Sequence, residues 1–397
     1  MHKSIACLVV ALAVAVTQST RAETLTTLYT FSGGVDGAYP QAGLVLDTQG
    51  NLYGTAYGGG SVSCTGGCGL VFEITPTGSE KVLHSFLGGA DGANPGAALI
   101  RDSQGNLYGT TYYGGSYGYG TVFELTPTGV ETVLHAFTGG TDGGFPNGGL
   151  VMDKQGHFYG TTTFGGLPNT EGGVVFEMTP DGTETVLYSF GATNGDGVTP
   201  QAGLILDAQG NLYGTTLYTG TYRDCCGTVF KVTPTGVATV LHTFTNYPDG
   251  AFPWSSLVFD TQGNLYGTTY GGGSYGYGTV FEITQLGTEM VIYSFKLPRF
   301  SSTNSHKRGD GANPVAGLVF DTQGNLYGTT KAGGVFSRYC IACGTIFKIT
   351  PTGSETVLYG FTGGADGAYP YSSLVFDTQG NLYGTTSDES EPLSPRV

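Results

Sequence analysis

One nine-residue motif occurs seven times along the chain and constrains its fold more than any other feature. It reads Asp-x-Gln-Gly-(Asn or His)-(Leu or Phe)-Tyr-Gly-Thr, and it begins at Asp47, Asp102, Asp153, Asp207, Asp260, Asp321 and Asp377. Its fifth position recurs at intervals of 51 to 61 residues, close to the period of about 50 residues that is typical of propeller blades. Residues that recur in every copy are therefore expected to build the frame.

Each repeat contains four short apolar segments, which indicate four strands. In the second repeat they cover residues 97–100, 107–111, 121–126 and 131–137, and glycine, proline or asparagine bounds each one. The third segment is apolar on both faces, as a strand must be when its sheet packs against neighbours on two sides. The sequence therefore predicts an all-β protein, a β-propeller of seven blades with four antiparallel strands each.

The links between these strands differ in length and define two rims. Residues 102–106 and 127–129 predict tight hairpins on one rim, because they are rich in residues that tolerate positive φ. The other two links in each repeat are longer and must lie on the opposite rim, called here the long-loop rim. All length variation falls in these longer links, so we expect any binding site there.

The two ends of the chain are expected to share the last blade. Residues 24–31 match the fourth strand of a repeat, and residues 373–386 match the first two. The segment 387–397 is acidic and contains proline, which suits a disordered tail better than a third strand. We therefore expect the propeller domain to span residues 23–386 and its last blade to be incomplete.

Residues 1–22 are typical of a secretory signal peptide. Lys3 precedes an apolar run from Ile5 to Val16, and Thr20 and Ala22 place small residues before a cleavage point. The prediction is an exported protein, extracellular or in the cell envelope. No second apolar stretch follows, so we expect no integral membrane span after cleavage.

Charge and composition narrow the class of partner. The formal net charge is -15 although only 11% of residues are charged, which argues against nucleic acid or an anionic membrane surface. The chain has 70 glycines and 26 tyrosines, a composition that suits neutral ligands such as glycans. We expect a monomer that binds a glycan or a protein and needs no cofactor.

The repeat resembles the bacterial GloVer choice-of-anchor tandem repeat family. Residues Gly317 to Thr330 and Gly344 to Pro351 carry the family pattern almost letter for letter, and the likeness covers nearly the whole chain after the leader. The resemblance implies an exported protein with no established catalytic activity. The chain departs from the pattern near Val397, where no apolar anchor helix occurs, so a secreted or a truncated form is expected.

An Asp-Gly-x-x-Pro loop on the long-loop rim supplies one carboxylate per repeat. Oxygen ligands of this kind suit calcium, but one carboxylate per blade makes a weak site, and an Asx turn that orders the loop is the favoured interpretation. The weak calcium candidates are Asp36, Asp91, Asp142, Asp196, Asp249, Asp310 and Asp366.

Six cysteines follow the leader, and all lie in the link between the second and third strands of a repeat. Their even number, their pairing within single loops and the predicted export favour three local disulfides. Zinc is the alternative, because Cys340 and Cys343 have ligand-like spacing. The expected pairs are Cys64 with Cys68, Cys225 with Cys226, and Cys340 with Cys343.

Histidine does not indicate catalysis in this chain. His84, His135 and His242 occupy a fourth-strand position that tyrosine fills in other repeats, which indicates packing. The repeating tyrosine of the second strand is likewise expected to fill the space between blades.

The least repetitive loops are the candidate binding residues. A basic insertion from Lys296 to Arg308 stands out in an acidic chain, and two Tyr-Gly-Tyr-Gly loops offer aromatic rings; a solvated loop and plain glycine-rich spacers are the alternatives. The candidates are Tyr117, Tyr119, Tyr275, Tyr277, Lys296, Arg299, His306, Lys307 and Arg308.

These patterns favour a non-catalytic binding module that acts through its long-loop rim. An extracellular hydrolase or lyase acting on polysaccharide and a purely structural envelope protein are the two alternatives. No catalytic residue is predicted, since no carboxylate or histidine outside the repeat forms a recognisable set.

Overall fold

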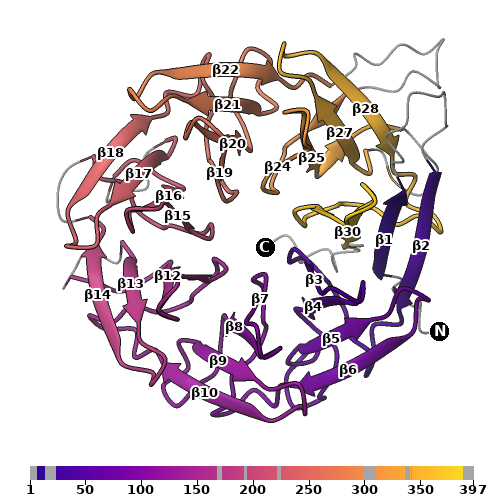
Figure 1. The fold of residues 1–397 in the computed structure, drawn as a ribbon, viewed down its shortest axis with the longest axis vertical. Coiled ribbons are helices and arrows are strands. Elements are labelled where there is room, and N and C mark those ends of the chain that lie inside the picture. The colour runs from indigo at the N-terminus through magenta and orange to yellow at the C-terminus, as the bar shows by residue number, and fades with distance from the viewer. Residues whose placement is uncertain are drawn as a thin grey trace, which may run out of the picture.

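The computed structural model describes residues 7–13, 24–167, 172–191, 195–220, 225–297, 310–335, 340 and 342–387. Its strands form four-stranded antiparallel sheets that surround a central axis like blades, as Figure 1 shows. The first strand of each blade lies nearest the axis and the fourth forms the outer wall. The predicted β-propeller is therefore confirmed.

Six blades each use four strands that follow one another in the blade order. Their bounds are β3 (Val45–Leu46), β4 (Leu52–Ala56), β5 (Leu70–Ile74) and β6 (Glu80–Ser85); β7 (Ile100–Arg101), β8 (Leu107–Thr111), β9 (Thr121–Leu125) and β10 (Glu131–Ala136); β11 (Val151–Met152), β12 (Phe158–Thr162), β13 (Val174–Met178) and β14 (Glu184–Ser189); β15 (Ile205–Leu206), β16 (Leu212–Thr216), β17 (Thr228–Val232) and β18 (Ala238–Thr243); β19 (Val258–Phe259), β20 (Leu265–Thr269), β21 (Thr279–Ile283) and β22 (Glu289–Ser294); β24 (Val319–Phe320), β25 (Leu326–Thr330), β27 (Thr345–Ile349) and β28 (Glu355–Gly360). A separate two-stranded sheet joins β23 (Gly311–Ala312) to β26 (Ala332–Gly333).

The last four-stranded sheet differs from the prediction. It joins β2 (Thr24–Phe31) and β1 (Cys7–Ala13) from the beginning of the chain to β30 (Leu382–Thr386) and β29 (Val375–Phe376) from its end. The expected fourth strand from residues 24–31 is confirmed, and with the leader region present the blade has four strands. The third strand comes from the apolar run assigned to the leader, and a chain cleaved after Ala22 would lose it.

The first strand of each blade is shorter than expected. Residues 97–100 were predicted as a strand, whereas β7 contains only Ile100 and Arg101. Near the axis the backbone before β7 bonds to the neighbouring blade in place of its own second strand. The Thr55 hydroxyl of the preceding blade, for example, donates to the Ala97 carbonyl at 3.2 Å. Convergence of the blades thus ends the ladder early.

The core lies between adjacent blades and depends on one phenylalanine in the third strand of six of the blades. Phe230 on β17 meets Phe190 of the preceding blade edge to face, with ring centroids 4.9 Å apart. Six such pairs occur, with centroid distances from 4.9 to 5.3 Å. The repeated glycine of the second strand makes room for this ring, since a Cβ atom on Gly214 would lie 2.7 Å from Phe230 Cζ.

The repeated aspartate organises the tight hairpin, as expected. Asp207 accepts hydrogen bonds from the backbone amides of Gln209 and Asn211, from the Asn211 side chain at 2.7 Å and from the Tyr213 hydroxyl at 3.0 Å. One carboxylate therefore satisfies four donors, which explains the joint repetition of Asp, Asn and Tyr.

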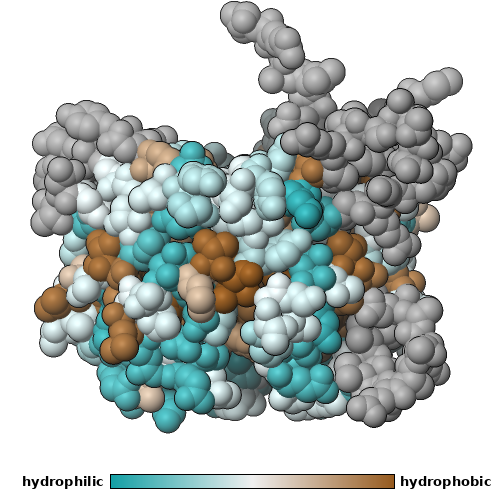
Figure 2. All heavy atoms as spheres, turned by 90° about the horizontal axis from the view of Figure 1, so that it is seen from above, coloured by the Kyte–Doolittle hydropathy of each residue, from teal (hydrophilic) through white to brown (hydrophobic). Residues whose placement is uncertain are grey.

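The outer wall carries no continuous apolar face in the view of Figure 2, where hydrophobic residues form separate patches among polar ones. Within the described part of the chain, there is no helix that is long and apolar enough to cross a membrane.

Candidate functional site

A ring of non-repeating side chains surrounds the axial opening on the long-loop rim. The long link of every blade enters the first strand through a proline, and the residue after that proline is half-buried or exposed beside the axis. These seven residues are Gln41, Gly96, Asn147, Gln201, Trp254, Val315 and Tyr371. The frame thus repeats while the residues at the opening do not.

A turn with positive φ directly precedes each of these prolines and directs the residue after the proline toward the axis. The residue before each proline has φ between 54° and 60°, although none of the seven is glycine. In six of the seven the amide donates to a carbonyl in the preceding blade, as Phe252 N does to Cys226 O at 2.7 Å. Non-glycine residues persist in this conformation only where the surroundings hold them. The turn therefore fixes the direction of the residues that follow.

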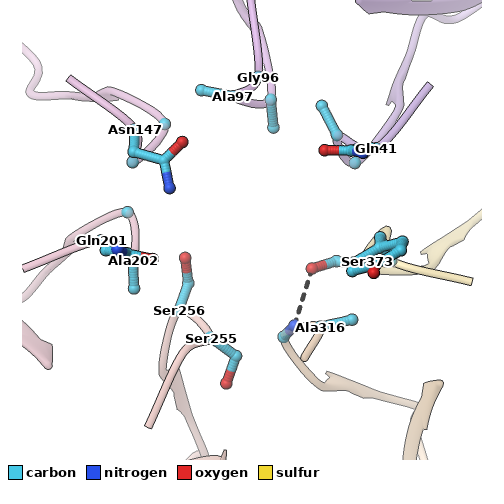
Figure 3. Close-up of a pocket in the computed structure, with 18 of the residues that line it drawn as sticks. Gln41, Gly96, Ala97, Asn147, Gln201, Ala202, Ser255, Ser256, Ala316 and Ser373 are labelled. Carbon is cyan, nitrogen blue, oxygen red and sulfur yellow. Dashed lines mark hydrogen bonds between the residues drawn. The ribbon is translucent and has the colours of Figure 1, made fainter. Parts of the chain in front are cut away.

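The opening leads into a cavity of about 350 Å³. Figure 3 shows the Asn147 side chain extending into it. The Ser373 hydroxyl accepts a hydrogen bond from the Gly317 amide at 3.0 Å. In each blade the two residues after the ring position are glycine, alanine or serine, and Leu99, Leu150 and Leu204 also line the cavity. Small residues are required because a Cβ atom on Gly203 would lie 3.1 Å from both Gly149 O and Ser256 Oγ.

The wall of this cavity combines amides with aromatic rings. The Trp254 indole N–H donates to Gln201 Oε1, and the Trp254 ring lies 5.4 Å from the Tyr270 ring. Across the opening, the Lys331 ammonium lies 4.8 Å from the centre of the Tyr371 ring. No carboxylate or imidazole occurs among the described residues that line the cavity. The wall can therefore bind a neutral hydroxyl-bearing ligand through amide hydrogen bonds and ring stacking.

The tyrosine loops predicted as a binding rim lie outside this cavity, and only half of their rings are available. Tyr117 and Tyr275 are exposed, whereas Tyr119 and Tyr277 pack against the blade cores. The Lys296 ammonium lies 5.7 Å from the centre of the Tyr275 ring. The other basic candidates, Arg299, His306, Lys307 and Arg308, lie outside the described residues.

The aspartates of the Asp-Gly-x-x-Pro loops are engaged with the strand that precedes them. Asp249 accepts a hydrogen bond from the backbone amide of Thr245, four residues earlier, and lies 3.1 Å from His242 Nε2. In other blades a tyrosine replaces the histidine, as Tyr293 donates to Asp310 at 2.6 Å. These carboxylates thus order the loop by bonding to nearby backbone, and the amide that they bind lies four residues earlier in the chain.

Histidine and tyrosine thus both point at the loop carboxylate from this fourth-strand position, although His84 and His135 lie 3.7 and 3.4 Å from it, farther than His242. This arrangement also leaves the weak calcium candidates occupied with internal donors. Among the described residues, no group of three or more histidine, cysteine, aspartate or glutamate side chains could hold a metal ion.

The cysteines pair within their own loops. Cys64 and Cys68 are joined with an S–S distance of 2.02 Å, and Cys225 with Cys226 and Cys340 with Cys343 form the other two pairs. Cys226, Cys343 and Cys68 are buried beneath the rim. Each pair therefore holds the long link between the second and third strands close to the core of its blade.

Pairs of carboxylates occur on the outer wall, where the first residue of a fourth strand approaches a loop aspartate of the preceding blade. Burial, and then the negative charge of Asp142, raise the pKa of Glu184 to about 7. A raised carboxyl pKa beside a second carboxylate is a pattern that general acids share. Here it recurs in five blades, which indicates a structural origin; the pairs are Asp36 with Glu80, Asp91 with Glu131, Asp142 with Glu184, Asp249 with Glu289, and Asp310 with Glu355.

These glutamates predict a pH dependence of stability. Burial and the loop aspartates raise the pKa of four of them to about 7 from an ordinary value of 4.5. Between these two values the folded state binds more protons than the unfolded state, so the glutamates' contribution to stability is complete below pH 4.5 and is lost as the pH rises through 7. His84 and His135 act oppositely, because burial lowers their pKa, but only below pH 6.5.

We therefore expect the melting temperature to fall between pH 6.5 and pH 8. A variant that replaces Glu131, Glu184, Glu289 and Glu355 with glutamine should lose most of this fall, because the neutral amide has no charge to desolvate. Thermal unfolding of both proteins across this pH range measures the effect. Equal slopes for the two proteins would show that these side chains ionise as freely as exposed glutamates.

Sequence reasoning missed the ring at the axial opening. The available signal was the position after each proline, which varies among amide, aromatic, aliphatic and glycine residues while its neighbours repeat. The sequence shows that this position varies, but it does not show where the side chains lie. Only the assembled propeller shows that the seven positions surround one opening.

The chain matches one known repeat family over most of its length. The sequence profile of the Gloeobacter/Verrucomicrobia repeat matches residues 14–225, 105–305 and 172–392. No curated protein shows a significant sequence match.

Solved structures with a similar arrangement have low sequence identity. A gluconolactonase from Xanthomonas campestris is 16% identical, with 71% of this chain and 83% of that chain covered and a TM-score of 0.41. The tricorn protease is 11% identical, with 80% and 26% covered and a TM-score of 0.45. A luciferin-regenerating enzyme is 14% identical, with 82% and 95% covered and a TM-score of 0.45.

Proposed function

Because the chain belongs to the Gloeobacter/Verrucomicrobia repeat family, its repeated residues are the frame, and we propose that its function resides in the residues that do not repeat. The proposed function is that of an exported, non-catalytic module that binds a neutral glycan at the axial opening of the long-loop rim. The observation that carries the proposal is the ring of seven non-repeating residues around one cavity.

The chemistry of that ring favours a glycan. Gln41, Asn147 and Gln201 each offer an amide that can donate to and accept from sugar hydroxyls. Trp254 and Tyr371 add rings on which the apolar face of a sugar can stack. The cavity volume of about 350 Å³ suits one or two sugar units at the end of a chain.

A hydrolytic function has less support. Glycoside hydrolysis usually needs two carboxylates on either side of the scissile bond, and the described lining of the cavity contains none. The carboxylate pairs of this protein lie on the outer wall and recur from blade to blade. We therefore retain binding without turnover as the proposal.

Export is supported by the cysteines. Three disulfides in surface loops are typical of proteins that fold in an oxidising compartment. The strongly acidic charge, -15, also favours a neutral ligand over nucleic acid.

A glycan array with the full chain tests the proposal, followed by titration of the best ligand. Asn147→Ala and Trp254→Ala should each weaken binding at least about tenfold, since each removes a hydrogen-bonding or stacking group worth about 1–3 kcal/mol. Tyr117→Ala is the matched control, because Tyr117 is an exposed aromatic residue of the same rim outside the cavity. Binding that survives both axial substitutions, or an array without any saturable ligand, would refute the proposal.

A further inference from the structure

The blade that contains both chain ends has a core that lacks one aromatic ring. In six gaps between blades, a phenylalanine of the third strand meets a phenylalanine at the end of the preceding fourth strand or directly after it. In the remaining gap Phe361 is only 1% exposed, yet no described residue supplies the corresponding ring. A narrow apolar pocket lies there instead, lined by Phe361, Ile346, Leu374 and Gly384.

The register of the strands shows which residue takes the place of the missing ring. Opposite the repeated glycine of the second strand, the other six blades place Phe72, Phe123, Phe176, Phe230, Phe281 and Phe347. In the last blade the residue opposite Gly384 is Val10 of β1. The irregularity in pairing with the fourth strand also falls at the same step, between Val9 and Val10. The segment Cys7–Ala13 therefore occupies the third-strand position in the correct register, but without phenylalanine.

The buried hydroxyl of Thr386 gives independent evidence that the third-strand position beside β30 fits a different sequence from that of Cys7–Ala13. In four blades the last threonine of the second strand bonds to a threonine that begins the third strand, at 2.8 or 2.9 Å. The equivalent residue of the last blade is Thr386, which is 1% exposed and whose hydroxyl has no hydrogen-bond partner. Its partner in the register is Leu8, which has no hydroxyl to offer.

The position of Ala11 leads to the same conclusion as those of Val10 and Leu8. Tyr108 and Tyr159 of other second strands donate to a glutamate on the third strand, at 3.2 and 3.1 Å. In the last blade Tyr383 donates to Asp377, and the third-strand residue opposite Tyr383 is Ala11. The residues of β30 thus select threonine, phenylalanine and a polar residue at the positions that Leu8, Val10 and Ala11 occupy in the strand beside it.

We propose that the position between β2 and β30 is a strand-binding site for an extended segment of sequence Thr-(Val or Ile)-Phe-(Glu or Lys)-(Ile or Leu), and that Cys7–Ala13 holds it as an imperfect occupant. The ligand is a third-strand segment of this repeat that is not already held in a blade, since the six third strands among the described residues, β5, β9, β13, β17, β21 and β27, are all paired within their own blades. Addition of a strand supplies two rows of backbone hydrogen bonds, and the side-chain pockets supply selectivity.

The test uses the full chain with Val10→Pro, which removes a ladder donor and displaces Cys7–Ala13 without shortening the protein. The probe is a labelled peptide with the sequence of residues 120–127, Gly-Thr-Val-Phe-Glu-Leu-Thr-Pro. The control peptide carries glycine in place of phenylalanine. Fluorescence anisotropy should show saturable binding of the probe, at least about tenfold tighter than that of the control peptide, because the missing ring fills an apolar pocket. The unmodified chain should bind the probe more weakly than the variant, since Cys7–Ala13 competes.

A second variant keeps the proposal testable if the proline variant does not fold. The triple substitution Leu8→Thr, Val10→Phe and Ala11→Glu places the selected side chains in the strand already present, and it should raise the melting temperature and abolish binding of the peptide. A lower melting temperature for this triple variant would overturn the proposal. Equal affinity of the proline variant for both peptides, or binding of neither, would also overturn it.

Discussion

Phe230→Ala should lower the free energy of unfolding by about 3–5 kcal/mol, the range for removal of a large aromatic side chain from a close-packed core. Phe230 is 1% exposed, lies between two blades and meets Phe190 edge to face. The cavity left by its removal would be walled by Leu212 on β16 and by Leu204, which directly precedes β15, and both strands are fixed by their own ladders. The site therefore has little freedom to collapse.

Urea unfolding measures this effect, with Val237→Ala as the control on the same blade. Val237 is 59% exposed, and its truncation should change stability by no more than about 0.5 kcal/mol. A loss for Phe230→Ala of the same size as for the control would contradict the core described between the blades.

Gly214→Ala should lower the free energy of unfolding by about 1–3 kcal/mol, the usual cost of adding a methyl group to a filled core. The new Cβ atom would lie 2.7 Å from Phe230 Cζ and 2.8 Å from Leu204 Cδ2. Neither contact is relieved by a flexible chain end, because both side chains are buried. The strand must shift, and its hydrogen bonds to β17 must distort.

Gly89→Ala is the matched control. Gly89 lies in an exposed loop, its Cβ position has no heavy atom within 4 Å, and its φ is not positive. The same substitution should therefore be neutral or stabilise by about 0.4–1 kcal/mol through the unfolded state. Thermal and urea unfolding of both variants separate the two cases; equal effects would show that the repeated glycine is not needed for packing.

Most of the frame could be predicted from the sequence because its determinants are local. Asp207 and Tyr213 lie within one hairpin, so their spacing alone indicates a structural role, which their hydrogen bonds confirm. The ladder lengths near the axis depend instead on a neighbouring blade, as the bond from Thr55 to Ala97 shows. A single repeat carries no information on that contact.

The first apolar run shows how one pattern can support two interpretations. Residues 7–13 are apolar without periodicity, which suits the core of a leader and a strand buried on both faces equally well. The sequence favoured the leader because of Lys3 and the small residues near Ala22. The structure pairs the same residues with β2 and β30, whereas cleavage after Ala22 stays a prediction.

The candidate site was harder to predict than the frame. Exposed tyrosine loops and the basic insertion were the most individual features of the sequence, yet Tyr117 and Tyr275 lie outside the axial cavity. Asn147 and Trp254 are separated by 107 positions in the sequence, and only the closed ring of blades places both on the wall of one cavity. The proposed binding residues come together only when all the blades have closed into a ring, so no single repeat reveals them.

Fluorescence of Trp254 offers the most direct test of binding at the axial opening. The chain contains one tryptophan, and its ring lines the cavity, so its emission reports on that site alone. Titration with the glycan that binds the full chain should change the emission in a saturable way, with the same dissociation constant as the array-derived titration, and Asn147→Ala should shift both equally. A glycan that binds the protein at saturation and leaves the emission of Trp254 unchanged would contradict the account.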